Sequence, residues 1–326
     1  MRQGTVLGIN ASVAAFALVA AQAVVAQSWP AKPVRIVVPF PPGGGVDFFA
    51  RVTATKLQEQ LGQQMVVENR SGASGMIGAD AVAKAPPDGY TTLFASVAEL
   101  TILQHLYPKI AYDAKKDLAP VTYAVHAAVL CSVHPSIPAR SLKELIALAR
   151  ARPGQLTYAA PGIGGVHHLS GELLKYSAKL DIVMVPYKGA GPAVIDMVGG
   201  QVTMGFTALP SSLPHARSGR LRAIAVTSGQ RSEVAPDLPT FTELGFPAID
   251  LVSWYAVLLP ARTPAEIVER LNTEVNRAVR SADVKARLLQ QGVEVVGTTP
   301  DQLATLMQSE ISRYGKVIKD AGIKGE

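Results

Sequence analysis

Two glycine-rich segments are the part of this sequence best suited to hold a ligand. The first, from Pro41 to Asp47, contains three consecutive glycines and lies between an apolar run and a helical pattern. Glycines let a backbone come close to a ligand, and the free amides at a helix start attract anions. The alternative is a turn that merely joins a strand to a helix. A phosphate loop fits less well, because no Lys-Ser or Lys-Thr pair follows the glycines.

The second segment runs from Tyr158 to His168 and also joins an apolar run to a helical pattern. A third, from Ser71 to Gly75, precedes another helix and adds hydroxyl groups. Backbone amides and hydroxyls are neutral donors that suit a carboxylate. If the first two segments belong to facing domains, each can hold one end of a small diacid, and closure about a hinge would bury it.

Enzyme chemistry has weaker support. His167 and His168 are adjacent, whereas a helical pair that binds one metal prefers i, i+4 spacing. The sequence contains no G-x-S-x-G elbow and no G-x-G-x-x-G spacing. Asp47 could be a catalytic acid, but a helix-start residue that fixes the loop is the favoured interpretation. Cys131, the single cysteine, lies in an apolar run typical of a core. We therefore expect no catalytic residue, no metal and no cofactor.

Apolar runs alternate with helical patterns along most of the chain, which predicts parallel sheets with helices on both faces. The pattern restarts near Val129, and the segment from about Thr263 to Lys324 is almost all helical. We expect two α/β domains. The first is discontinuous and comprises residues 27–126 and 251–326, and the second comprises residues 127–250. The chain would then cross a hinge twice.

The first 26 residues have the pattern of a signal peptide. Arg2 precedes an apolar run from Val13 to Ala21, and small residues end at Ala26. The alternative is a transmembrane anchor, but the run is shorter than the roughly 20 apolar residues that a span needs. The pattern predicts cleavage after Ala26 and a periplasmic protein.

The formal net charge is +6, and Lys and Arg are scattered without a basic run or interleaved aromatic residues. Nucleic acid is therefore not an expected partner. A weakly basic surface helps to attract anionic solutes.

Ordered motifs along the predicted mature chain resemble those of the tripartite tricarboxylate transporter substrate-binding proteins, also called the Bug family. The matching segments are Val34 to Asp47 with Arg51, Val67 to Gly75, Pro87 to Thr91, Tyr158 to Leu169, Val185 to Gly189, Leu221 to Thr227, Leu238 to Thr240, Trp254, and Leu259 to Leu271. The resemblance implies a periplasmic binding protein type II-like fold, with two α/β domains joined by a hinge and the ligand cleft between them. It also implies delivery of a small carboxylic acid, such as a dicarboxylate, a tricarboxylate or an acidic amino acid, to membrane transporter subunits without catalysis.

By the same resemblance, loop amides, hydroxyls and ordered water bind the carboxylates. The residues at the matching positions are Gly43, Gly44, Asp47, Ser71, Ala73, Ser74, Ser96, Gly162, Gly164 and His167. The sequence departs from the family pattern at Thr203 and Thr207, where acidic or polar residues are common. Thr207 is expected to offer a hydroxyl to the ligand, which favours a simple acid, whereas Glu99 would favour a cationic group. The identity of the ligand is therefore open.

Two other functions are also open. The protein could be an extracytoplasmic sensor for a signalling partner, or a secreted α/β hydrolase of carboxylated substrates. A binding protein needs a polar cleft, whereas an enzyme needs a base within hydrogen-bond reach of a nucleophile. In either case we expect a monomer.

Overall fold

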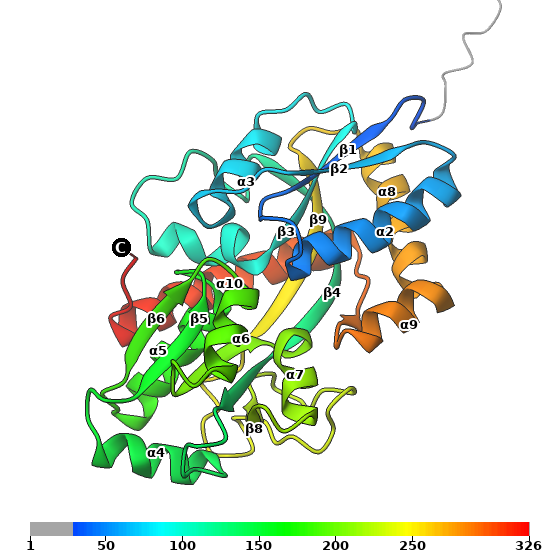
Figure 1. Ribbon diagram of the computed structural model, residues 1–326. Helices are drawn as coiled ribbons and strands as arrows, with labels where there is room; N and C mark the ends of the chain where they lie inside the picture. The colour runs from blue at the N-terminus through cyan, green and yellow to red at the C-terminus, as the bar shows by residue number, and fades with distance from the viewer. Residues whose placement is uncertain (1–28, 326) are drawn as a thin grey trace, which may run out of the picture.

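The computed structural model describes residues 29–325, so the predicted signal peptide and its cleavage site lie outside the described part of the chain. Two sets of three parallel strands, joined by two long antiparallel strands, form its framework (Figure 1). The strands are β1 (Val34–Val38), β2 (Met65–Asn69), β3 (Thr91–Ser96), β4 (Leu118–Val133), β5 (Thr157–Pro161), β6 (Val183–Tyr187), β7 (Met204–Ala208), β8 (Arg222–Val226), β9 (Val252–Pro260) and β10 (Glu294–Val295). The helical elements are α2 (Gly45–Leu61), η1 (Ala73–Gly75), α3 (Met76–Ala83), η2 (Ala98–Ile102), η3 (Leu103–His105), α4 (Leu142–Ala151), α5 (Val166–Ala178), α6 (Ala190–Val198), α7 (Leu209–Arg217), α8 (Ala265–Arg280), α9 (Ala282–Gln290) and α10 (Pro300–Ala321).

The first parallel set has β1 in the middle, with β2 and β3 on either side. Alternate residues of these strands point to opposite faces, as strand geometry requires. Ile36 and Phe94 share a buried cluster with α2, where Phe49 stacks on Phe94 at 5.1 Å between ring centroids. Val37 and Leu93 instead share a cluster with α3. Helices therefore cover both faces, as the alternating pattern predicted.

The second parallel set has β5 in the middle, between β6 and β7. Its two faces are again buried by different helices. Tyr158 packs in the same cluster as Leu169 of α5, whereas Ala159 packs with Ala193 and Met197 of α6. Cys131 is fully buried beside this set, which confirms its predicted place in the core.

The two long strands that connect the sets correct one prediction. β4 pairs antiparallel with β9 from Leu118 to Ala128, and antiparallel with β7 and β8 from Val129 onward. The prediction of parallel sheets is therefore right for the outer strands and wrong for the middle of the framework. The changeover on β4 between Ala128 and Val129, and the start of β9 at Val252, lie near the predicted domain boundaries. The division into two domains stays a prediction.

The helical C-terminal region packs back onto earlier elements. α8 lies against α2 and β4, and α10 lies across the middle of the molecule, against β4, η2 and α5 (Figure 1). Helix α10 therefore contacts elements of both parallel sets. Within residues 29–325, no helix combines the length and apolar character needed to cross a membrane.

Candidate functional site

The loop between β1 and α2 presents free backbone amides at a helix start. Gly44 is the N-cap of α2, and no side chain caps the helix there. The first amides of a helix have no acceptor within it, so they form a ready site for an anion. Gly43 has φ +85°, a conformation that favours glycine. Both glycines are exposed, so this helix start lies at the surface of the protein.

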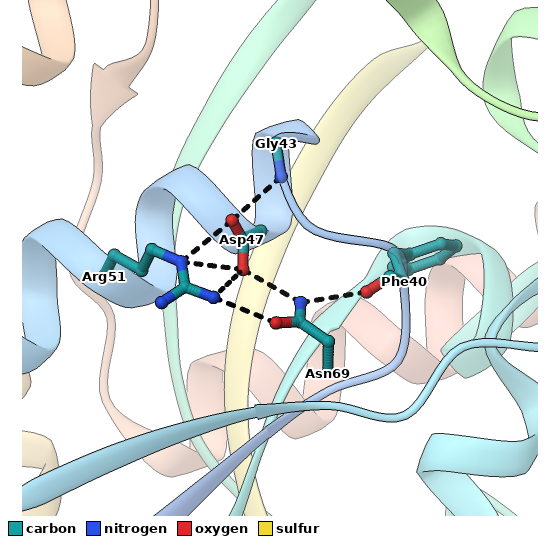
Figure 2. A network of polar contacts seen from close by, with 5 residues as sticks. All are labelled: Phe40, Gly43, Asp47, Arg51 and Asn69. Carbon is teal, nitrogen blue, oxygen red and sulfur yellow. Dashed lines mark hydrogen bonds and ion pairs between the residues drawn. The ribbon is translucent and has the colours of Figure 1, made fainter.

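Asp47 holds this loop in shape (Figure 2). Its buried carboxylate accepts hydrogen bonds from the Gly43 amide at 2.9 Å, from Arg51 Nε at 3.0 Å and from Asn69 Nδ2 at 2.8 Å. Asn69 also donates to the Phe40 carbonyl at 3.0 Å. Burial opposes ionisation of Asp47, but these hydrogen bonds outweigh it and lower the pKa of its carboxyl. The network favours the interpretation of Asp47 as the residue that fixes the loop. The positive charge of Arg51 is paired with the Asp47 carboxylate.

The loop between β2 and α3 has an unusual backbone. Four consecutive residues have positive φ, namely Gly72 (+137°), Ala73 (+46°), Ser74 (+53°) and Gly75 (+98°). Positive φ at a non-glycine residue costs of order 1 kcal/mol or more, and such strain gathers at functional sites. Ser71 and Ala73 are exposed, and Ser74 is half-buried. This strained loop therefore lies partly exposed at the carboxyl end of β2.

The loop between β5 and α5 repeats the features of the first loop. Gly165 is the N-cap of α5 and again has no side-chain cap. Gly162 and Gly164 have φ of +80° and +77°. The Gly164 amide donates to Nδ1 of His168 at 3.1 Å, so His168 shapes the loop as Asp47 shapes the first one. A second uncapped helix start therefore lies at the carboxyl end of β5.

His167 lies in the first turn of α5. Its Nε2 atom is buried and has no hydrogen-bond partner in the described part of the chain. Burial lowers the pKa of its imidazole to about 4, so the ring is neutral at physiological pH. A buried nitrogen without a partner is costly, and a ligand or a water molecule at this place would supply one.

The loops of the two parallel sets meet. Ser74 Oγ donates to the Ile163 carbonyl at 3.2 Å, which joins the loop after β2 to the loop after β5. A Cβ atom on Gly164 would lie 2.7 Å from Leu103 Cδ2 and 2.9 Å from Leu106 Cδ1, so this loop packs directly against the segment after β3. The loops after β2, β3 and β5 therefore lie against one another, and a ligand held from both sides stays a prediction.

The two threonine departures lie in different places. Thr207 is fully buried near the end of β7, and its hydroxyl shares a 2.5 Å hydrogen bond with Ser212. Thr203 lies before β7, where it bonds Thr157 at the amino end of β5. Thr203 is therefore at the opposite end of the strands from the loops. A hydroxyl contact from Thr207 to a ligand stays a prediction.

Three features of the site were missed. Tyr255 of β9 lies so close to Gly45 that a Cβ there would be 2.3 Å from the tyrosine oxygen. Phe40 packs against the β2–α3 loop, where a Cβ on Gly75 would lie 3.1 Å from its ring. Gly189 is the N-cap of α6, and again no side chain caps the helix. This helix start lies beside the β5–α5 loop, because the Gly162 amide donates to the Tyr187 carbonyl at 2.7 Å. The Lys188-Gly189 pair at the end of a strand could have indicated the helix start at Gly189.

Comparison with known proteins identifies the family of this chain. The model of the family described as "Tripartite tricarboxylate transporter family receptor" matches residues 49–323. The chain is 42% identical to Protein BugT of Bordetella pertussis, over 92% of each chain. The chain belongs to this receptor family.

Two solved structures support the fold of the receptor. One, a protein of R. palustris with adipate, is 39% identical, with a TM-score of 0.86 over 91% of this chain and 99% of that one. The other, the periplasmic binding protein BugD, is 30% identical, with a TM-score of 0.83 over 91% of this chain and 100% of that one. The predicted family and the periplasmic binding protein fold are confirmed. The receptor is a solute-binding protein of the tripartite tricarboxylate transporter type.

Proposed function

We propose that this receptor captures a small carboxylic acid between its two sets of loops, in the periplasm, and delivers it to the membrane subunits of a tripartite transporter. The acid is a dicarboxylate, a tricarboxylate or a related carboxylated solute. The observation that carries the proposal is that the loops of the two parallel sets meet at the Ser74–Ile163 hydrogen bond, while an uncapped helix start follows a strand in each set, at Gly44 and at Gly165. The adipate-bound relative supports a diacid.

The anchoring groups are neutral. No Lys or Arg lies within Pro41–Asp47 or Pro161–His167. The nearby guanidinium of Arg51 is held by Asp47 and Asn69. A carboxylate would therefore be bound by amide dipoles, each charged hydrogen bond contributing about 1.5–3 kcal/mol. The predicted contacts from Ser71, Ala73, Ser74, Ser96 and the other site residues form part of this proposal.

Gly44→Val gives a sharp test. Gly44 has φ −82° and ψ 172°, which valine adopts readily, and the nearest atom to a new Cβ is the Pro41 carbonyl oxygen at 3.8 Å. The fold therefore tolerates the change, but the side chain stands where a carboxylate would approach α2. Loss of one charged hydrogen bond raises Kd roughly 10- to 100-fold.

The measurement is calorimetry with acetate, adipate and citrate as probes for one, two and three carboxylates. Gly199→Ala serves as the control, since Gly199 lies at the far end of α6 and has an ordinary helical conformation. Binding that survives in Gly44→Val, with an unchanged Kd, would refute the anchoring role of α2. If none of the three acids binds the wild type, the carboxylate function itself is wrong.

We further propose that the receptor is a monomer without turnover. Ser96 and Glu99 have the residue types of a nucleophile and a base, and they share a hydrogen bond after β3. The carboxylate of Glu99, however, also accepts a hydrogen bond from the amide of Ser96 itself. That arrangement is a local cap of the turn after β3, and in the described part of the chain no other side chain hydrogen-bonds to the Glu99 carboxylate. A binding function accordingly stands ahead of the hydrolase, and the family description supports delivery to a transporter over a sensor role.

A further inference from the structure

A buried carboxyl group lies against the β2–α3 loop, one of the proposed ligand loops. Glu99 is only 3% exposed. Its Oε1 accepts from the Ser96 amide at 2.6 Å, and its Oε2 accepts from the Ser96 hydroxyl at 2.5 Å. A Cβ atom on Gly75 would lie 3.3 Å from Cδ of Glu99, so the carboxyl supports the loop whose residues have positive φ. Glu99 is thus almost completely covered by protein next to the proposed site.

The charge environment of this carboxyl is unusual. Within residues 29–325, no Lys, Arg or His side chain forms an ion pair or hydrogen bond with it. The titratable groups that face it are Tyr255 from β9 and Tyr112, which donates to the Glu99 backbone carbonyl at 2.6 Å. The negative charge of Asp80, on α3, also acts on Tyr112 and helps to raise its pKa. Burial raises the pKa of both tyrosines, so they stay neutral and Glu99 alone titrates near neutrality.

Burial raises the pKa of Glu99 to about 7, although the hydrogen bonds from Ser96 oppose this effect. When Glu99 is ionised, the Ser96 hydroxyl proton is used in the bond to Oε2. The Ser96 oxygen meanwhile accepts from the Ala98 amide at 3.3 Å. When Glu99 is protonated, its own proton can bond the Ser96 oxygen, and the serine proton becomes free for another acceptor. The protonation state of Glu99 thus decides whether Ser96 has a proton to donate.

This inference rests on the proposed carboxylate function. We propose that Glu99 takes up one proton when the receptor binds a carboxylate, and that Ser96 then donates its hydroxyl to the ligand. The negative charge of a bound ligand carboxylate repels the ionised Glu99 carboxylate, and protonation of Glu99 removes this repulsion. The proton comes from solvent, and no bond of the ligand changes. The receptor therefore holds its anion more tightly as pH falls toward neutrality.

Calorimetry of the tightest binder among acetate, adipate and citrate tests this linkage. Titrations in phosphate and in Tris at about pH 8 give the number of protons taken up, because the two buffers differ in ionisation enthalpy. We expect uptake approaching one proton for the wild type and none for Glu99→Gln. The wild-type Kd should rise about tenfold per pH unit above pH 7.5, whereas the Kd of the variant stays flat.

Glu269→Gln is the matched control, because Glu269 is exposed on α8 and the same charge is removed far from the loops. This control should take up protons as the wild type does. Binding without proton uptake, equal uptake in Glu99→Gln, or proton release on binding would each overturn the inference while leaving carboxylate capture intact. Release would mean that ionised Glu99 pairs with a cationic group of the ligand. If none of the three acids binds the wild type, the inference and the proposed function fall together.

Discussion

Replacement of Glu99 by glutamine should stabilise the free protein in a strongly pH-dependent way. The carboxyl titrates at 4.5 when unperturbed, and burial raises its pKa to about 7 in the folded protein. A pKa raised this far means that ionised Glu99 costs the folded state about 3 kcal/mol above pH 7. Glutamine has the same shape, can keep both bonds to Ser96 and carries no charge.

The sign follows from the order in which the two states ionise. Between the unfolded and folded pKa values, the unfolded chain loses its proton while the folded chain keeps it, so wild-type stability falls as pH rises through this window. Below about pH 4 both states are protonated, and the penalty is absent. The advantage of Glu99→Gln should therefore be near zero at about pH 4 and approach 3 kcal/mol at about pH 8.

Urea denaturation followed by the fluorescence of buried Trp254 measures this difference. Comparing the variant with the wild type at both pH values cancels any packing cost that does not depend on pH. Glu269→Gln, on the exposed face of α8, should show no such difference between the two pH values. An equal change in unfolding free energy at about pH 4 and about pH 8 would show that Glu99 is ionised normally, and the reasoning would be wrong.

Four further predictions follow from the site. Gly164→Ala should lower stability by about 1–3 kcal/mol in urea denaturation, because its Cβ would meet Leu103 at 2.7 Å and its φ is +77°; unchanged stability would disprove that packing. Arg51→Met should weaken acid binding far less than Gly44→Val in calorimetry, and the reverse order would indicate a salt-bridge clamp. Intact-mass measurement of periplasmic material should show cleavage after Ala26, and an uncleaved, membrane-embedded chain would contradict export. Time-resolved NMR of a bound acid should show no new product signals.

Local patterns were sufficient for the first half of the framework. β1, β2, β3 and the helices between them follow from apolar runs separated by glycine and proline, because each unit pairs with a neighbour close in sequence. β9 was missed, although its residues are almost all buried. It pairs with β3 and β4, more than a hundred residues away, and no local pattern reports such a partner.

At the site, too, contacts between residues close in sequence could be predicted, whereas contacts between distant residues could not. The i, i+4 spacing of Asp47 and Arg51 and the i, i+3 spacing of Ser96 and Glu99 are visible in the sequence. The contact of Tyr255 with the start of α2 is not, because it depends on how β9 is placed across β3. That no described Lys, Arg or His pairs with Glu99 likewise depends on how the molecule packs.

The continuity of β4 bears on how the molecule can be dissected. Ala128 and Val129 are neighbours along one strand, yet they pair with β9 on one side of the changeover and with β7 on the other. A fragment cut at this peptide bond would leave strand edges whose amides and carbonyls lack their partners, and exposed edges of this kind recruit other chains. Separately expressed halves should therefore aggregate, and a reporter domain is better inserted at the exposed Gly219 turn between α7 and β8 than in the crossing strands.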